Sequence, residues 1–321
     1  MFRALLLLLG GAGCWLGWRY AGVRLADPPR YLHELGDGPL LVVGDLQRTS
    51  ALESWVLRRE QNDAERARLL RAVEAEADAG GMLLLGDLVF DGSSAAEWER
   101  FDTLLAPLRG RGMVVALGNH DYWGPNAVAR AHLRARFPWL NERSWEVVRW
   151  ESVALVVVDT NEDELEPARW RAQRRWFERT LAGLDADPSV RMVVLACHHP
   201  PYTNSTVTGD ELHVQRAFVE PLADHPKARL VLSGHVHAYE HFVEGGVHYV
   251  VSGGGGGPRV TLREDEAARH VDRFEGPSPR PFHFLVLRGV PRGLAVEVRG
   301  FRTGETAVGI LDRFVVPWPG R

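Results

Sequence analysis

Five short polar clusters in this chain contain the residue types that bind metal ions. Carboxylates, imidazoles and amide oxygens are all ligands of divalent cations. One glycine-aspartate or glycine-asparagine pair after a strand is ordinary turn chemistry, but five such clusters in one chain predict a shared metal site. In sequence order the clusters are Gly44-Asp45-Leu46-Gln47, Gly86-Asp87-Leu88-Val89-Phe90, Gly118-Asn119-His120-Asp121, Cys197-His198-His199-Pro200 and Gly234-His235-Val236-His237.

Each cluster directly follows a short apolar run that is typical of a β-strand. Loops at the carboxyl ends of strands in an open α/β sheet converge on a ligand, so we expect the clusters to share one edge. Side chains two residues apart lie on the same face of an extended segment, which predicts that Asp45 and Gln47 point into one site, as do His235 and His237. The expected strands are 39–43, 82–85, 113–117, 192–196 and 230–232.

Helical periodicity between these runs predicts an α/β domain. The first expected helix begins at Asn62 or Asp63 and is ended by Gly80-Gly81. Four further helices are expected at 94–108, 126–136, 167–184 and 211–223. Residues 147–150 and 153–158 are expected to form a pair of strands. The last apolar runs, 247–251, 282–287 and 294–298, follow one another without helices and predict an antiparallel end to a mixed sheet.

The composition is that of an ordinary globular protein. The 321 residues are 25% charged and 45% hydrophobic, which excludes a disordered, collagenous or polytopic membrane chain. A formal charge of -4 gives no global electrostatic case for a nucleic-acid partner. Two cysteines, Cys14 and Cys197, indicate no disulfide framework, and Cys197 is expected in the core.

Residues 4–18 are uncharged and apolar, which predicts a targeting segment. As a helix they would span roughly 22 Å, short of the roughly 30 Å hydrocarbon layer, so both a signal peptide and a membrane anchor fit. No clear cleavage site follows, which slightly favours an uncleaved anchor. We expect residues 1–25 to be the signal or anchor, 26–36 a linker and 37–321 one catalytic domain. The side of the membrane and the oligomeric state stay open.

The five clusters, in this order, resemble the signature blocks DxH or DxQ, GDxx, GNHD/E, HxP and GHxH of the calcineurin-like metallophosphoesterase superfamily. The run 234–240, GHVHAYE, and the tail containing HYVVSG at 248–253 are similar to the purple acid phosphatase branch. The resemblance implies a four-layer α-β-β-α sandwich of two mixed sheets with two metal ions at the loop edge.

The resemblance also implies a role for each residue. Asp45 and His237, with Gln47 as a weaker ligand, would hold the first metal ion, and Asp87 would bridge to the second. Asn119, His198 and His235 would complete the second site. Phe90 stands where purple acid phosphatases have an iron-binding tyrosine, so divalent Mn, Fe or Zn is expected.

Four residues, among them the expected ligand Asn119, are expected to act on the substrate or to support the residues that do. His120 would protonate the leaving group or stabilise the transferring phosphoryl group. Asp121 would orient the His120 ring, or serve only as a turn residue. Asn119 and His199 would contact the phosphate, with a merely structural role equally open for His199.

Two divalent ions bring four positive charges, of which Asp45 and Asp87 neutralise two. The site should attract a phosphate ester and generate hydroxide near neutral pH as the nucleophile. The predicted function is hydrolysis of a small phosphorylated substrate, with a monoester slightly preferred over a diester or pyrophosphate. Gln47 and Phe90 motivate the alternative of a non-catalytic metal-binding or partner-binding protein. A serine hydrolase is excluded because no GxSxG motif occurs.

Several other residues near the clusters are expected to have structural roles. Tyr202, Asn204 and Tyr239 suit packing or turns better than lining the pocket. The glycine run 253–257 is expected to be a flexible turn, because no P-loop lysine follows it.

Overall fold

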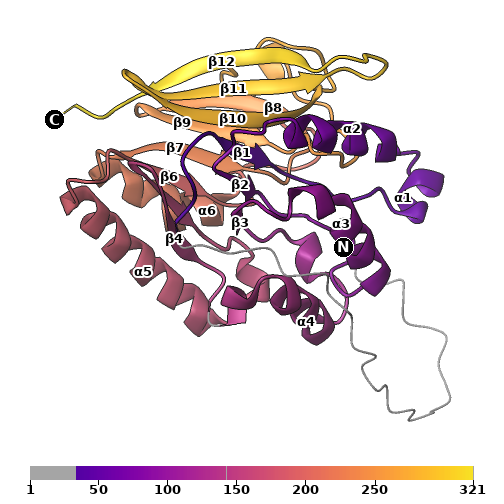
Figure 1. Cartoon of the computed structure of the whole chain (residues 1–321), viewed down its shortest axis with the longest axis horizontal. Helices are drawn as coiled ribbons and strands as arrows, with labels where there is room; N and C mark the ends of the chain where they lie inside the picture. Colours follow the sequence, from indigo (N-terminus) through magenta and orange to yellow (C-terminus); the bar gives the residue numbers. More distant parts are fainter. Residues whose placement is uncertain (1–33, 142, 321) are drawn as a thin grey trace.

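Two six-stranded β-sheets pack face to face in the computed structural model, which describes residues 34–141 and 143–320 (Figure 1). The first sheet has the order β12-β11-β10-β1-β2-β3, and the second β4-β5-β6-β7-β9-β8. Strands β1 to β3 are parallel, and β10 to β12 extend their sheet in antiparallel fashion. In the second sheet β5, β6, β7 and β9 are parallel, while the edge strands β4 and β8 are antiparallel.

The strands of the first sheet are β1 Leu40–Val43, β2 Gly81–Leu84, β3 Met113–Val115, β10 Phe282–Val290, β11 Gly293–Phe301 and β12 Gly309–Pro317. Those of the second sheet are β4 Glu146–Trp150, β5 Val153–Val157, β6 Met192–Ala196, β7 Ala228–Ser233, β8 Tyr239–Glu244 and β9 Val247–Ser252.

Helices cover the outer face of each sheet and complete four layers. Helices α2 Asp63–Glu74, α3 Ala95–Leu104 and α4 Asn126–Arg136 pack on the first sheet. Helix α5 Pro167–Ala186 packs on the second sheet, with α6 Leu212–Val214 and the two short turns that continue it. Helix α1, Ala51–Val56, buries no residue. The predicted four-layer sandwich is confirmed.

The main core lies between the two sheets. Leu40 and Leu83 of the first sheet share it with Leu155 and Val194 of the second, all of them almost fully buried. Because the helices bury the outer faces as well, central strands such as the wholly buried β5 and β6 are apolar at every position. This double burial explains why the central strands can be recognised from sequence.

Three strands or helices were not predicted, and three predictions were wrong in detail. The missing ones are α1, β8 and β12. Helix α2 ends at Glu74 and not at Gly80-Gly81. Strand β9 does not join the antiparallel end of the first sheet; it pairs parallel to β7 in the second. It reaches that place through a hairpin with β8, whose turn residues Gly245 and Gly246 both have positive φ, as tight hairpins require. The helix expected at 211–223 consists of α6, a π turn and a 3-10 turn.

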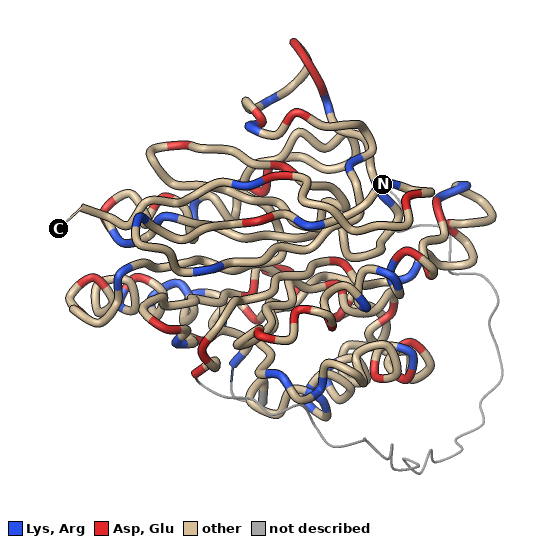
Figure 2. The backbone as a smooth tube through the Cα atoms, turned by 45° about the horizontal axis from the view of Figure 1, so that its top comes forward, with Lys and Arg blue, Asp and Glu red and all other residues tan. Residues whose placement is uncertain are grey.

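The expected linker ends earlier than residue 36. The Leu35 side chain is buried in the core between the sheets, and its amide donates to the Arg149 carbonyl at 2.8 Å. The expected signal or anchor, residues 1–25, lies outside the described residues, and its identity stays a prediction. Among residues 34–141 and 143–320, no helix combines the length and apolarity needed to span a bilayer. Acidic and basic residues are interspersed along the fold (Figure 2).

Glu240 on β8 ties the second sheet to the loop after β6. Its carboxylate accepts hydrogen bonds from the Thr203 hydroxyl at 2.6 Å and the Asn204 amide at 2.7 Å. The side chain is fully buried, and this burial raises the pKa of Glu240 to about 7 although both hydrogen bonds oppose the shift. The folded protein therefore holds this proton at a pH where the unfolded chain has lost it.

We expect Glu240→Gln to reduce the pH dependence of stability. In the unchanged protein, this group makes the free energy of unfolding fall by about 3 kcal/mol as pH rises from below 4.5 to above 7, because only the unfolded state ionises in that window. Urea unfolding at pH 5 and pH 8 measures the difference. Glu244→Gln, on the exposed end of the same strand, is the control. An unchanged pH slope in Glu240→Gln would contradict the assignment.

Candidate metal centre

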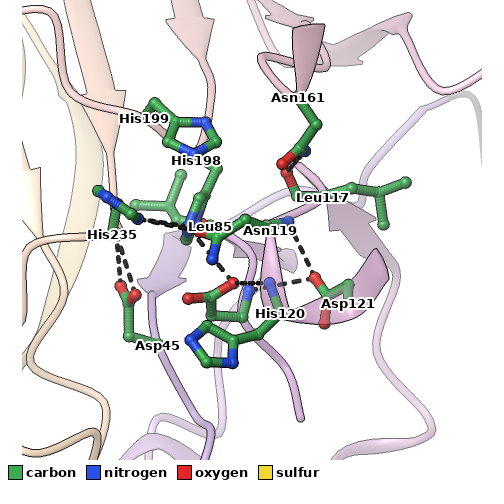
Figure 3. Close-up of polar contacts among 12 residues, drawn as sticks. Asp45, Leu85, Leu117, Asn119, His120, Asp121, Asn161, His198, His199 and His235 are labelled. Carbon is green, nitrogen blue, oxygen red and sulfur yellow. Dashed lines mark hydrogen bonds and ion pairs between the residues drawn. The ribbon is translucent and has the colours of Figure 1, made fainter. Parts of the chain in front are cut away.

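The five polar clusters lie together at the carboxyl edges of β1, β2, β3, β6 and β7, as the sequence predicts. Asp45, Asp87 and His198 each present one ligand atom, and these atoms lie within 4.8 Å of one another. Figure 3 shows His235 between His199 and Asp45, with Asp121 on the opposite side of the cluster. Two buried carboxylates and several imidazoles therefore share one site.

The backbone turns sharply at three of these residues. Asp45, Asp87 and His235 have φ of 59°, 51° and 67°, in the left-handed region. Such a conformation costs on the order of 1–3 kcal/mol per residue and persists only where the surroundings fix it. The expectation that alternation along an extended strand directs these side chains was therefore wrong. Turns direct them instead, and hydrogen bonds between the loops hold the turns.

Asp45 and His237 form the first half of the cluster. The Asp45 carboxylate accepts from the His235 backbone amide at 3.0 Å, and its Oδ1 lies 3.4 Å from His237 Nε2. His237 Nδ1 donates to the Pro258 carbonyl at 2.8 Å, which leaves Nε2 directed at the carboxylate. Together these contacts present one oxygen and one nitrogen that can bind a cation.

Gln47 adds a third group of the right chemistry. Its side chain is 4% exposed, and its amide oxygen has no hydrogen-bond partner among the described residues. An unpartnered buried acceptor costs about 1–3 kcal/mol, and a cation would satisfy it. Gln47 therefore fits the metal-binding role that the sequence suggested.

Asn119, His198 and His235 form the second half with Asp87. His198 Nε2 lies 3.2 Å from Asn119 Oδ1, 3.2 Å from His235 Nδ1 and 3.4 Å from Asp87 Oδ1. His235 Nδ1 lies 3.0 Å from the same Asn119 oxygen. His198 Nδ1 donates to the Leu85 carbonyl at 2.7 Å, so its Nε2 faces the cluster.

The charges of the site favour a bound cation. Burial and the charge on His198 lower the pKa of His235 to about 3. Burial also opposes protonation of His198, but the negative charge of Asp87 outweighs it and raises that pKa to about 9. Burial likewise opposes ionisation of Asp87, yet the neighbouring imidazoles hold its pKa far below the usual range. The Asp87 carboxylate thus stays ionised, and a metal ion can replace the proton that His198 holds.

His120 lies beside this cluster and is fixed by contacts of its own. Its Nδ1 donates to the Phe90 carbonyl at 2.7 Å, and its backbone amide donates to Asp87 Oδ1 at 2.9 Å. The ring packs against Trp123, with centroids 3.9 Å apart, and against Phe90 at 4.9 Å. The Phe90 side chain is therefore packed against His120, and Nε2 is the remaining polar atom of the His120 ring.

Asp121 does not orient the His120 ring, so this prediction was wrong. Its buried carboxylate accepts hydrogen bonds from the backbone amides of Asp87, Leu88 and Gly118 at 2.9–3.1 Å. Burial and the charge of Asp87 raise the pKa of Asp121 to about 7. Asp121 joins the loops after β2 and β3, and the Phe90 carbonyl orients the His120 ring instead.

His199 reaches the cluster, whereas three other residues named from sequence do not. Its ring centroid lies 4.6 Å from that of His235 and 4.9 Å from that of His198. Its Nδ1 contacts the Thr160 hydroxyl, a neighbour that sequence reasoning missed. The other three have the structural roles that the sequence predicts: Tyr202 packs on Tyr249, the Asn204 amide donates to Glu240, and the Tyr239 hydroxyl donates to Asp312. The predicted core position of Cys197 is also confirmed.

The glycine run 253–257 is a structural part of the site, and its description as a flexible turn was wrong. All five residues are buried, and the amide of Gly257 donates to the Asp45 carbonyl at 3.0 Å. A Cβ at Gly257 would lie 2.6 Å from the His237 ring. The glycine run directly follows a buried strand, and this position in the sequence could have indicated a close approach to another part of the chain.

Comparisons with known proteins agree with this architecture. Residues 38–239 match the family model described as calcineurin-like phosphoesterase. A probable cyclic nucleotide phosphodiesterase from a Synechococcus species is 32% identical over 171 residues, which are 51% of this chain and only 59% of that relative.

Solved structures share the fold at low sequence identity. A purple acid phosphatase from yellow lupin seeds has a TM-score of 0.68 and 16% identity, over 90% of this chain and 54% of that one. A dimetal phosphatase from Danio rerio has a TM-score of 0.58 and 14% identity, over 91% and 100%.

We expect Gly118→Ala to disrupt the site although it replaces none of the residues that could bind a metal ion. The new Cβ would lie 2.1 Å from Asp87 Oδ1, so the carboxylate must move, and overpacking of this kind costs about 1–3 kcal/mol. Metal content by elemental analysis and Tm should both fall. Gly183→Ala, on α5 with open space around its Cβ, is the control and should keep both. Full metal content in Gly118→Ala would refute this close-packing account.

Proposed function

Because the chain belongs to the calcineurin-like phosphoesterase family, we propose that it hydrolyses phosphate esters with the help of two divalent metal ions. The observation that carries the proposal is the buried group of Asp45, Asp87 and His198, whose ligand atoms lie within 4.8 Å of one another. Carboxylates without nearby cations are unstable in such a setting, so the group suits cation binding better than a purely structural role.

The two ions would be held by different sets of residues. Asp45, Gln47 and His237 would bind the first ion, Asn119, His198 and His235 the second, and Asp87 would bridge them. The mixture of oxygen and nitrogen ligands suits Mn, Fe or Zn. Such ions, when bound, lower the pKa of a coordinated water and neutralise charge on the phosphoryl oxygens.

The chain's own residues then bind the phosphate and move a proton. Only two carboxylates stand among the proposed ligands, so the loaded site keeps positive charge and attracts a phosphate ester. Because the Phe90 carbonyl accepts from His120 Nδ1, Nε2 is the ring atom left to exchange a proton with the leaving oxygen, and it donates that proton when both ring nitrogens carry hydrogen. Asn119 and His199 would contact the remaining phosphoryl oxygens. Asp121 supports this arrangement through backbone amides, without touching substrate.

Within this class, a phosphodiester is the second candidate beside the monoester that the sequence analysis slightly preferred. It is favoured by the cyanobacterial relative, which carries the name of a cyclic nucleotide phosphodiesterase. We further propose that residues 1–25 act as a signal or membrane anchor for the catalytic domain.

The deciding experiment supplies the metal-stripped full chain with Mn, Fe, Zn or Mg in turn. Hydrolysis is measured with p-nitrophenyl phosphate, bis-p-nitrophenyl phosphate and 3′,5′-cyclic AMP. We expect one of the transition metals to restore turnover, and the preferred ester identifies monoesterase or diesterase. No turnover with any metal, together with fewer than two ions per chain, would favour the non-catalytic alternative.

Two variants separate metal binding from proton transfer. Asp87→Ala should lose both turnover and metal, because the proposed bridging carboxylate is gone. His120→Ala should keep both ions and lose about 10²–10⁴-fold in kcat, the usual contribution of a positioned acid. Elemental analysis and initial rates measure the two effects. A fully active Asp87→Ala enzyme is incompatible with the two-metal mechanism.

A further inference from the structure

Thr160, just after β5, touches His199 twice through one hydroxyl group. Its side chain is 1% exposed. Oγ1 accepts a hydrogen bond from the His199 backbone amide at 3.1 Å and lies 2.8 Å from His199 Nδ1. A hydroxyl carries a single hydrogen, and of these two neighbours only Nδ1 can accept it. The oxygen has lone pairs for both neighbours, but Oγ1 has no other hydrogen-bond partner among the described residues, so only donation to Nδ1 satisfies the buried hydroxyl hydrogen. The proton of the neutral ring then lies on Nε2.

The same reasoning gives His198 and His237 the opposite tautomer. Their Nδ1 atoms face the carbonyl oxygens of Leu85 and Pro258, which can only accept. Those rings carry hydrogen on Nδ1 and offer the Nε2 lone pair to a cation. A carbonyl partner at Nδ1 thus leaves Nε2 as a metal ligand, whereas a hydroxyl partner at Nδ1 leaves Nε2 as a hydrogen-bond donor.

We propose that Thr160 is a positioning residue that keeps His199 as a hydrogen-bond donor to the phosphoryl group and prevents it from coordinating metal. Distance alone suggests a three-histidine metal site, because ligand atoms of His198, His199 and His235 lie within 4.8 Å of one another. A protonated Nε2 has no lone pair for a cation but can donate to an anionic oxygen. The inference rests on the proposed function, since it assumes that a phosphate enters beside the ions.

The loop around Thr160 is held firmly enough to maintain this contact. Its carbonyl oxygen lies 2.9 Å from His213 Nε2, whose ring also contacts Glu211. The neighbouring Asp159 amide donates to Gln173 on α5 at 2.8 Å, and Asn161 Nδ2 donates to the Leu117 carbonyl at 2.8 Å. The backbone around Thr160 is therefore anchored by the segment after β3, by α5 and by α6, which keeps the hydroxyl against His199.

A spectroscopic experiment tests the tautomer directly. The full chain is labelled with 15N-histidine and loaded with 113Cd, and couplings between cadmium and ring nitrogens are recorded. We expect couplings at His198, His235 and His237, and none at His199, whose Nε2 should resonate as a protonated nitrogen. A 113Cd coupling at His199 would overturn the proposal. This readout does not depend on turnover, so it can succeed even if the protein hydrolyses no ester.

Binding of inorganic phosphate to the metal-loaded chain tests the consequence. Thr160→Val should weaken phosphate binding about tenfold or more, and should raise KM more than it lowers kcat, because the donor is no longer fixed. Thr160→Ser retains the hydroxyl and should restore both values. Thr103→Val, which removes an exposed hydroxyl on α3, is the control. Wild-type phosphate affinity in folded Thr160→Val, or no rescue by serine, would overturn the proposal.

Discussion

The buried carboxylate of Asp87 is the group on which the geometry of the site depends. It is 1% exposed, and a carboxylate taken out of water is tolerated only with charged or hydrogen-bonding partners close by. The His120 amide and the His198 ring supply such partners, and they come from the loops after β3 and β6. One anion thus joins segments from both sheets, and the two halves of the sandwich must stay in register for it to be stable.

A second carboxylate, that of Asp121, acts on the backbone. Its three hydrogen bonds to amides fix the loop in which Asp87 has a left-handed φ. Two nearby buried carboxylates repel each other, which is one reason why the pKa of Asp121 is raised. The fold tolerates this repulsion because its loop amides and imidazoles surround the pair. The strain of the turn and the repulsion of the carboxylates are therefore concentrated in one place, where a cation would offset part of the repulsion.

The sequence predicted most of the architecture, and the exceptions have physical causes. Strands such as β6 are buried on both faces and read as uninterrupted apolar runs, so their bounds could be predicted closely. Strand β8, YEHFVE, contains polar residues whose buried partners are distant in sequence, and α1 buries nothing that would create a periodic pattern. Strand β12 is largely exposed at the edge of its sheet.

The residues of the site could be identified from the sequence, but the directions in which their side chains point could not. Spacing identified Asp45 and His235, yet their left-handed turns depend on hydrogen bonds from other loops. The role of Asp121 depends on amides up to 34 positions away, and Thr160 lies 39 positions from the ring it contacts. Local patterns contain no information on such long-range pairs.

The buried glycine run 253–257 has a consequence for how this protein tolerates change. Each of these glycines lies so close to another part of the chain that an added methyl group would overlap it, most directly at the Val236 and Gly44 carbonyl oxygens and the His283 ring. In a saturation mutagenesis screen the run should therefore be as intolerant as the residues that we propose bind metal, although it has no reactive side chain. Changes in substrate preference during evolution would therefore require substitutions in the outer loops, because close packing around residues 253–257 excludes larger side chains there.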